Sequence, residues 1–315
     1  MAYLENKNVV ITGAGRGLGR AYAHLAAAEG ASVIVNDIDA DAAESATEEI
    51  VKAGGRAVCH VADVGDWAAA EGLIQRCVDE FGTIDGLVNN AGLFYVGFAP
   101  EQNENHLRQM VSVNIVGVAA CATHAMRHMV DQGHGSIVNV VSGAHLGIKY
   151  MGAYGATKGA VASFTYSWAL ELEGTGVRVN AISPLARTRM GADSASFYAE
   201  HGLGVINNNQ SPDPSVNAPL VVFLLSDASS ALHGQIVRIE GHQLAVVAHP
   251  AVREPVLKSD GWTVGGIEAA FSETLGRYLV PVGMAPLLRA EYLSGASEFW
   301  DGRAEQPDTS GASRD

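Results

Sequence analysis

A glycine-rich turn between a strand and a helix constrains the fold of this chain more than any other feature. The turn has the sequence TGAGRGLG at 12–19, follows the apolar run NVVITG at 8–13 and leads into the helical segment RAYAHLAAAEG. Gly13, Gly17 and Gly19 permit a tight turn and a close backbone approach around Leu18. The N-terminus of the following helix offers free N–H groups and the positive end of its dipole to a pyrophosphate. The pattern therefore predicts a dinucleotide-binding strand–turn–helix unit.

Short β-branched runs alternate with helical segments along most of the chain. Seven such runs occur, at 8–13, 31–37, 56–63, 84–92, 136–142, 177–183 and 235–241. They are continuously apolar, which indicates strands that are buried on both faces of a parallel sheet. Glycines stand where the intervening helices should end, at Gly30, Gly54, Gly82, Gly133 and Gly174. The fold class that we expect is α/β, a doubly wound (Rossmann-like) seven-stranded parallel sheet with helices on both faces, as a single domain plus a C-terminal extension.

The periodicity also suggests how the chain is divided. Residues 1–245 form the expected nucleotide-binding catalytic domain, 246–300 an extension that lids the site or contacts another subunit, and 301–315 a disordered tail. Within the extension, 261–279 could form an amphipathic helix. The segment 185–217 has weak periodicity and is expected to be mobile near the site.

Composition excludes several classes of function. Lys and Arg number 20 against 34 Asp and Glu, a net charge of -14 with no basic block, so we expect no nucleic acid and no anionic membrane as partners. Three cysteines are too few and too irregular for a disulfide framework or a zinc site, which favours the cytoplasm. His124 and His128 are spaced for one helix face, but the glutamate of a zinc protease motif is absent, so we predict no metal.

The second apolar run ends in a carboxylate that bears on the choice of dinucleotide. Asp37 lies 24 residues after Gly13, where an acceptor for adenosine ribose hydroxyls is expected. A 2'-phosphate beside Asp37 would bring two anions together, so Asp37 favours NAD and disfavours NADP. Arg16 in the turn acts the other way, unless it is only a solvated turn residue. Asp63 is either an adenine contact or a helix-capping residue.

Tyr154 and Lys158 form the strongest catalytic candidate. They are four residues apart in YGATK, so a helix would place them on one face about 5–6 Å apart. A Tyr hydroxyl is only about one part in a thousand ionised at pH 7, and a neighbouring ammonium favours the phenolate, which makes a usable general base. Ser142 ends the preceding strand.

Together these motifs resemble those of the short-chain dehydrogenase/reductase family over residues 5–245. The resemblance rests on TGAGRGLG, Asp63-Val64, NNAG at 89–92, Asn114, Ser142, YGATK and NAISP at 180–184. It implies hydride transfer between a secondary alcohol and a nicotinamide. Tyr154 would take the alcohol proton, Ser142 would bind the substrate oxygen, Lys158 would bind ribose hydroxyls and lower the Tyr154 pKa, and Asn114 would hold a relay water. Further cofactor contacts are implied for Val64, Asn90, Ala91, Gly92, Pro184 and Thr188, and His145 is expected near the substrate.

Two departures from the family pattern concern the loops at the site. Ser142 lies 12 residues before Tyr154, one fewer than usual, and Leu185 replaces a common Gly after Pro184, with Thr188 one place early. The string SPLARTRM resembles a branch related to the peroxisomal multifunctional β-oxidation enzyme and 17-beta-hydroxysteroid dehydrogenase type 4. That branch acts on 3-hydroxyacyl-CoA thioesters and hydroxysteroids, so an apolar small-molecule substrate is expected, with assembly as a homodimer or homotetramer. The alternatives are an NADP-linked ketone reductase and a non-catalytic nucleotide sensor on the same fold.

Overall fold

The fold is described by a computed structural model that covers residues 2–203, 211–252 and 254–279. It divides the chain into two units, Met1–Ala248 and His249–Asp315. The predicted tail at 301–315 and the later part of the predicted extension lie outside the described residues. In the second unit, α9 spans Val264–Glu273, inside the segment where an amphipathic helix was expected, and the 3-10 turn η7 spans Leu275–Tyr278.

The first unit is built on one sheet with the strand order β3-β2-β1-β4-β5-β6-β7-β8. All seven predicted strands are present and parallel: β1 Asn8–Ile11, β2 Ser32–Asp37, β3 Arg56–Val61, β4 Gly86–Asn89, β5 Gly135–Val140, β6 Val177–Leu185 and β7 Ile236–Glu240. The prediction of a doubly wound sheet is therefore confirmed. An eighth strand, β8 Gln243–Val246, extends it, and β8 pairs antiparallel with β7.

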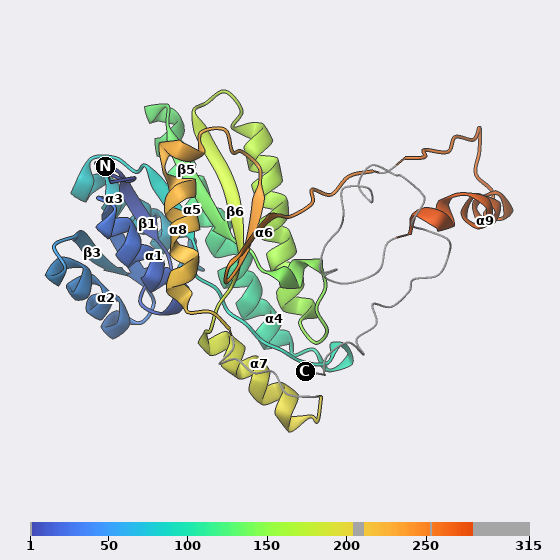
Figure 1. Cartoon of the computed structure of the whole chain (residues 1–315), viewed down its shortest axis with the longest axis horizontal. Coiled ribbons are helices and arrows are strands. Elements are labelled where there is room, and N and C mark those ends of the chain that lie inside the picture. Colours follow the sequence, from blue (N-terminus) through green and yellow to red (C-terminus); the bar gives the residue numbers. More distant parts are fainter. Residues whose placement is uncertain (1, 204–210, 253, 280–315) are drawn as a thin grey trace, which may run out of the picture. The chain divides into compact units, whose positions relative to one another are not determined.

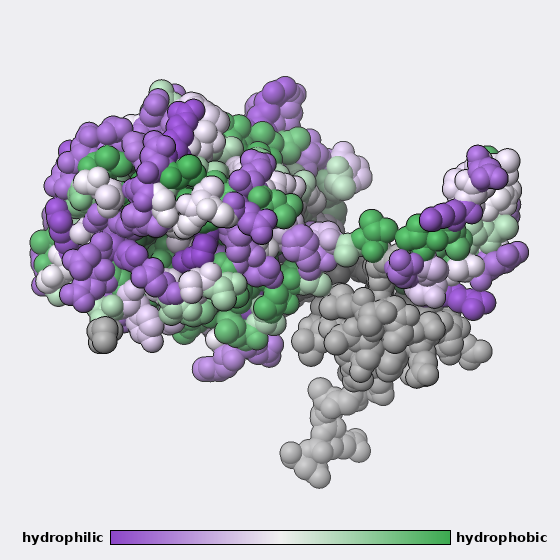
Figure 2. All heavy atoms as spheres, turned by 90° about the horizontal axis from the view of Figure 1, so that it is seen from above, coloured by the Kyte–Doolittle hydropathy of each residue, from purple (hydrophilic) through white to green (hydrophobic). Residues whose placement is uncertain are grey.

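Helices cover both faces of the sheet (Figure 1). One face packs against α1 Gly17–Ala28, α2 Ala40–Lys52 and α8 Ala218–Leu225, around Tyr22, Ile50 and Leu220. The other face packs against α3 Trp67–Phe81 and α5 Val118–Gln132, with α6 Gly152–Glu171 alongside. Two further helices, α4 Glu104–Val111 and α7 Arg189–Glu200, follow β4 and β6. Hydrophilic and hydrophobic residues are interspersed over the visible face of the larger unit (Figure 2).

Residues Glu104–Gln132 form one continuous helical stretch from α4 through α5. By length and composition alone this stretch could cross a membrane, but 50% of its apolar window is buried inside the protein. Its buried residues, such as Cys121 and Met129, pack against α3 and the sheet. The apolar composition of the stretch is therefore accounted for by packing in the core.

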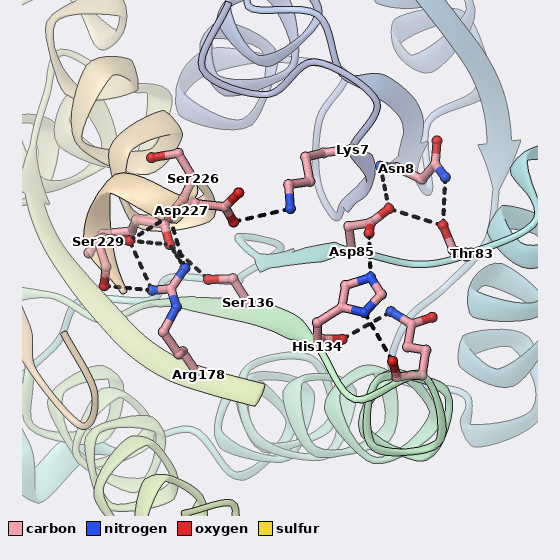
Figure 3. Close-up of polar contacts among 12 residues, drawn as sticks. Lys7, Asn8, Thr83, Asp85, His134, Ser136, Arg178, Ser226, Asp227 and Ser229 are labelled. Carbon is pink, nitrogen blue, oxygen red and sulfur yellow. Dashed lines mark hydrogen bonds and ion pairs between the residues drawn. The ribbon is translucent and has the colours of Figure 1, made fainter. Parts of the chain in front are cut away.

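A polar network ties together the amino ends of the central strands (Figure 3). The buried carboxylate of Asp85 accepts hydrogen bonds from the Asn8 backbone N–H at 2.8 Å and the Thr83 hydroxyl at 3.0 Å, and lies 2.9 Å from His134 Nε2. The guanidinium of Arg178, at the start of β6, donates to carbonyl oxygens at the C-terminal end of α8, where a cation is favoured by the helix dipole. Burial lowers the pKa of Arg178. This edge of the sheet is held by polar contacts, and the opposite, carboxyl edge carries the predicted site residues.

Candidate active site

The glycine turn packs so closely that side chains are excluded at Gly13, Gly15 and Gly19. Gly13 and Gly17 adopt left-handed backbone angles, φ +61° and +55°. A Cβ on Gly13 would lie 2.8 Å from Ala91 Cα, and one on Gly19 would lie 2.2 Å from the Gly13 carbonyl oxygen. The Cβ position of Gly17, by contrast, has no atom within 4 Å in the part of the chain that the structure describes. The start of α1 is therefore open to a ligand on the side where its N–H groups are exposed.

Asp37 is fixed against this turn, as the sequence predicts. Its carboxylate accepts hydrogen bonds from Gly15 N–H at 3.0 Å and from Asp39 N–H at 3.1 Å. A Cβ on Gly15 would lie 2.9 Å from the Asp37 Oδ2 atom, so this close approach requires glycine. The sequence analysis did not single out Gly15, although it is the middle glycine of the run GAGRG.

Arg16 lies at the N-cap of α1 but does not cap the helix with its side chain. Its guanidinium Nη1 instead lies 2.6 Å from Asp39 Oδ2. The Asp39 carboxylate also accepts the Ala42 N–H at 3.0 Å and thereby caps α2. The Ala42 N–H and the Arg16 guanidinium lower the pKa of Asp39. Arg16 is therefore ion-paired with Asp39. The sequence had suggested either a contact with a 2'-phosphate or a solvated turn residue, and did not predict this pair.

The NNAG segment after β4 is joined to the glycine turn through Thr12. The Thr12 hydroxyl oxygen accepts hydrogen bonds from the backbone N–H groups of Asn90 and Ala91, each at 3.0 Å. The Asn90 side chain donates to the carbonyl oxygens of Thr12 and Gly13 at 2.9 and 3.0 Å. Asn90 therefore supports both turns, and Thr12 is a supporting residue that the sequence analysis missed.

Asp63 and Val64 take different positions after β3. Asp63 is exposed, and its carboxylate accepts the Gly65 N–H at 2.9 Å. The residue that caps α3 is Asp66, whose side chain accepts the Ala69 N–H. Val64 is buried against Gly117, where a Cβ would lie 2.9 Å from a Val64 methyl group. Of the two predicted roles for Asp63, the helix cap is therefore filled by Asp66.

Tyr154 and Lys158 lie in the first two turns of α6, with Ser142 just beyond the end of β5. Lys158 Nζ lies 5.9 Å from the centre of the Tyr154 ring and donates to the Val140 carbonyl oxygen at 2.7 Å. Both side chains are buried, and the Ser142 side chain is hydrogen-bonded to Tyr154. The structure thus brings the predicted Ser, Tyr and Lys together at the carboxyl edge of the sheet.

Burial dominates the ionisation of this group. It raises the pKa of Tyr154 to about 12, and the hydrogen bond from Ser142 acts in the opposite direction. Burial also lowers the pKa of Lys158 to about 8. The sequence had suggested that Lys158 lowers the Tyr154 pKa; here the group that lowers it is Ser142, and the loss of hydration around the phenolate is the larger effect.

Asn114 is fully buried in a π-helical turn, η2 Ser112–Gly117. Its side chain accepts Leu93 N–H at 2.7 Å and donates to the Leu93 carbonyl oxygen at 2.9 Å and to the Thr157 hydroxyl at 3.0 Å. A Cβ on Gly92 would lie 3.3 Å from Asn114 Oδ1 and 3.6 Å from Lys158 Nζ. Gly92 therefore lies between Asn114 and Lys158, and π-turns of this kind often mark functional sites.

The remaining predicted residues lie on the loops after β5 and β6. His145 Nδ1 contacts the Ser142 carbonyl oxygen, which also accepts the His145 backbone N–H at 3.1 Å. Pro184 pairs with Ile239 of β7, and Thr188 caps α7 by accepting Gly191 N–H at 3.3 Å. His145 is therefore next to the catalytic group, whereas Pro184 and Thr188 position the chain that leaves β6.

Aromatic side chains join the loops around this site. Phe94 meets the Tyr154 ring edge to face, with centroids 5.0 Å apart. Phe98, which follows β4, contacts Tyr150 before α6 at 5.3 Å and Phe197 of α7 at 5.4 Å. Tyr150 has φ +66°, a left-handed angle that is rare for an aromatic residue. We call Phe98, Tyr150, Phe197, Tyr198 and His201 the aromatic cluster; no single sequence motif had indicated it.

One of the two histidines considered as metal ligands lies in the core. His124 is buried, with its ring 5.6 Å from that of Trp67, and burial lowers its pKa. Among the residues that the structure describes, no group of three or more potential ligand side chains is placed to hold a metal ion. His124 therefore acts as a core residue.

Comparisons with known proteins agree with this arrangement. The sequence profile described as short chain dehydrogenase matches residues 7–198. The chain is 33% identical over 239 residues to the (2S)-[(R)-hydroxy(phenyl)methyl]succinyl-CoA dehydrogenase subunit BbsD of Thauera aromatica, covering 76% of this chain and 96% of that protein. It is 34% identical to meso-2,3-butanediol dehydrogenase of Serratia marcescens, covering 79% and 98%. The crystal structure of a short chain dehydrogenase from Mycobacterium avium superposes with a TM-score of 0.79 at 34% identity, covering 90% of this chain and 100% of that one.

The chain therefore belongs to the short-chain dehydrogenase/reductase family. It is an oxidoreductase enzyme, of a family that binds a nicotinamide dinucleotide and acts on small molecules.

Proposed function

We propose that the protein is an NAD-dependent dehydrogenase that interconverts a secondary alcohol and a ketone, with Tyr154 as general base and acid. The observation that carries this proposal is the meeting of Ser142, Tyr154, Lys158 and Asn114 beside a glycine turn whose Gly15 N–H donates to Asp37 at the end of β2. A non-catalytic nucleotide sensor would need the turn but not the proton-transfer group.

The residues at the glycine turn fit a dinucleotide. Side chains are excluded at Gly13 and Gly19, while the space beside Gly17 is open at the start of α1. The N–H groups there suit the pyrophosphate, and the Asp37 carboxylate suits the adenosine ribose hydroxyls. Lys158, near Gly92, is placed to bind the hydroxyls of the other ribose. The bound dinucleotide supplies hydride acceptance from the carbinol carbon.

Proton transfer is the work of the side chains on α6 and β5. In alcohol oxidation the Tyr154 phenolate takes the hydroxyl proton while Ser142 donates a hydrogen bond to the substrate oxygen and holds it in place. In ketone reduction the Tyr154 hydroxyl returns the proton. Asn114 makes hydrogen bonds to Leu93 and Thr157, which fix the π-turn beside Lys158. In this position Asn114 would hold a relay water.

The substrate that we propose is an apolar secondary alcohol of the hydroxyacyl-CoA or hydroxysteroid kind. Phe94 and the aromatic cluster supply apolar surface on three loops that follow the catalytic edge of the sheet. One relative is named for a hydroxy(phenyl)methylsuccinyl-CoA, and another, 36% identical, for cis-4-hydroxycyclohexanecarboxylate, from Sinomonas cyclohexanicum. We further propose a cytoplasmic homodimer or homotetramer.

The test is reduction of NAD and of NADP, followed by absorbance, across hydroxyacyl-CoAs, hydroxysteroids and simple secondary alcohols, with the Tyr154→Phe variant as the blank. We expect turnover with NAD that falls by at least about a thousandfold in the variant, while NAD binding is retained. Full activity of Tyr154→Phe would refute the assigned base. Binding of NAD without turnover of any of these substrates would favour the sensor, and faster turnover with NADP would favour the NADP-linked reductase.

A further inference from the structure

We propose that Asp39 is a specificity-determining residue, which pairs with Arg16 and so withholds that guanidinium from the 2'-phosphate of NADP. The inference rests on the proposed function, because it requires a nicotinamide dinucleotide with its adenosine ribose at Asp37. It adds a second acidic residue, in the loop between β2 and α2, to the selection that Asp37 makes at the end of β2.

The position of Asp39 is determined from three sides. Its backbone N–H donates to Asp37 Oδ1 at 3.1 Å, its Oδ1 accepts Ala42 N–H at 3.0 Å, and its Oδ2 lies 2.6 Å from Arg16 Nη1. The Asp37 carboxylate meanwhile accepts Gly15 N–H, next to Arg16 in the chain. The expected ribose site is therefore bordered by two fixed carboxylates, and Arg16 is already bound to one of them.

The balance of charge at this site explains why the pair matters for selection. Arg16 and Asp39 form a pair whose charges cancel, with Nη1 and Oδ2 2.6 Å apart. The Asp37 carboxylate lies beside this pair, since it accepts the N–H groups of Gly15 and Asp39. Without the charge of Asp39, the Arg16 guanidinium loses the carboxylate it is paired with, and a 2'-phosphate with nearly two negative charges is attracted to it.

The same pair contributes little to folding. The Arg16 and Asp39 side chains are 56% and 37% exposed, and exposed ion pairs usually have small effects on stability. The contribution of Asp39 to stability comes mainly from its N-cap on α2. Asparagine caps helices equally well. Asp39→Asn therefore removes the charge and retains the cap.

The experiment measures the dissociation constants of NAD and NADP by calorimetry for the wild type, Asp39→Asn, the double variant Arg16→Ala/Asp39→Asn and Asp41→Asn. Asp41→Asn is the matched control, because Asp41 is an exposed acid in the first turn of the same helix. One unit charge beside a bound phosphate corresponds to roughly a tenfold change in binding. We expect NADP to bind roughly tenfold more tightly to Asp39→Asn than to the wild type, with NAD affinity changed less than about twofold.

The double variant and the control make the inference falsifiable. The gain in NADP affinity should disappear when Arg16 is also replaced, and Asp41→Asn should retain the selectivity of the wild type. The inference is overturned if Asp39→Asn shows no gain while NAD binds normally, if Asp41→Asn shows an equal gain, or if the gain persists without Arg16. Failure of the wild type to bind either dinucleotide would instead overturn the proposed function, and this inference with it.

Discussion

The ionisation of Tyr154 depends on two opposing effects of its surroundings. Burial of the Tyr154 ring, which meets Phe94 edge to face, raises its pKa to about 12, while the hydrogen bond from Ser142 lowers it. Near neutral pH the tyrosine is therefore protonated almost completely. It is ready to act as an acid toward a ketone, and only a small fraction is ready to act as a base toward an alcohol.

The two reaction directions should consequently differ in their dependence on pH. Between pH 6 and 8 the phenolate fraction rises about tenfold per pH unit, so alcohol oxidation should rise by up to that factor, while ketone reduction should stay nearly constant. Lys158 keeps its proton over most of this range, because its pKa is about 8. Initial rates at saturating substrate and dinucleotide, measured in both directions, check the prediction.

Ser142→Ala supplies a control for the origin of this dependence. Loss of the hydrogen bond raises the Tyr154 pKa further, so between pH 6 and 8 alcohol oxidation should fall by a larger factor than ketone reduction. A fall by the same factor in both directions would show that Ser142 binds substrate without affecting the ionisation of Tyr154.

At the scale of single residues, the sequence predicted the side chains with reactive groups better than the residues that hold them in place. Tyr154, Lys158, Ser142 and Asp37 could be found because each bears a reactive group at a fixed distance from a strand end or a glycine. Thr12, Gly15 and Asp39 could not be found in the same way. Their contacts join segments far apart in the chain or depend on how a loop closes, and a linear pattern carries neither.

The elements that could be predicted were those with continuous burial. Each parallel strand is an apolar run because helices cover both sides of the sheet. The eighth strand was missed although Leu244, Ala245 and Val246 are apolar, because Gln243–Val246 is short and follows β7 with no helix between them; all four of its residues are exposed. Its pairing follows from the Gly241-His242 turn, which reverses the chain after β7.

The helix α7 is attached to the rest of the site mainly by ring contacts. Phe197 contacts Phe98 at 5.4 Å, Tyr150 at 5.9 Å and His201 at 4.3 Å, and thereby links α7 to the loops after β4 and before α6. Aromatic pairs contribute about 0.5–1.5 kcal/mol each beyond their burial. The attachment of α7 should therefore depend strongly on this one residue.

We expect Phe197→Leu to raise the KM for substrate roughly fivefold, because loss of these contacts loosens α7 beside the catalytic group. NAD affinity should stay unchanged, since the glycine turn is built on other elements. Steady-state kinetics with both substrates varied checks this. Phe164→Leu is the matched control. It removes a ring that stacks on Trp168, with centroids 4.5 Å apart, on α6 instead of α7. An equal rise in KM in the control would show that the effect is not specific to α7.

At the scale of the whole molecule, α6 presents an apolar residue that the fold of one chain leaves uncovered. Leu170 is 76% exposed near the end of α6. Burial of such a residue against a second subunit is favourable by roughly 25 cal/mol per Å² of apolar surface. We predict that α6 contributes to the interface of the proposed homodimer or homotetramer.

Leu170→Asp should therefore shift the protein toward smaller species, because a charge would be buried at the contact. Sedimentation velocity of the wild type and the variant at equal concentration measures the shift. Val51→Asp, which places the same charge on an exposed position of α2, is the control and should sediment like the wild type. An unchanged distribution for Leu170→Asp would remove α6 from the interface.

The two edges of the sheet carry out separate tasks. Asp85, His134 and Arg178 hold the strands and α8 together at the amino edge, and the chemistry lies at the carboxyl edge on loops joined by aromatic rings. Changes in the loops that follow β4 and β6 therefore leave the contacts that hold the strands intact. This scaffold is suited to laboratory evolution: libraries confined to those loops should retain soluble expression while their substrate preferences diverge.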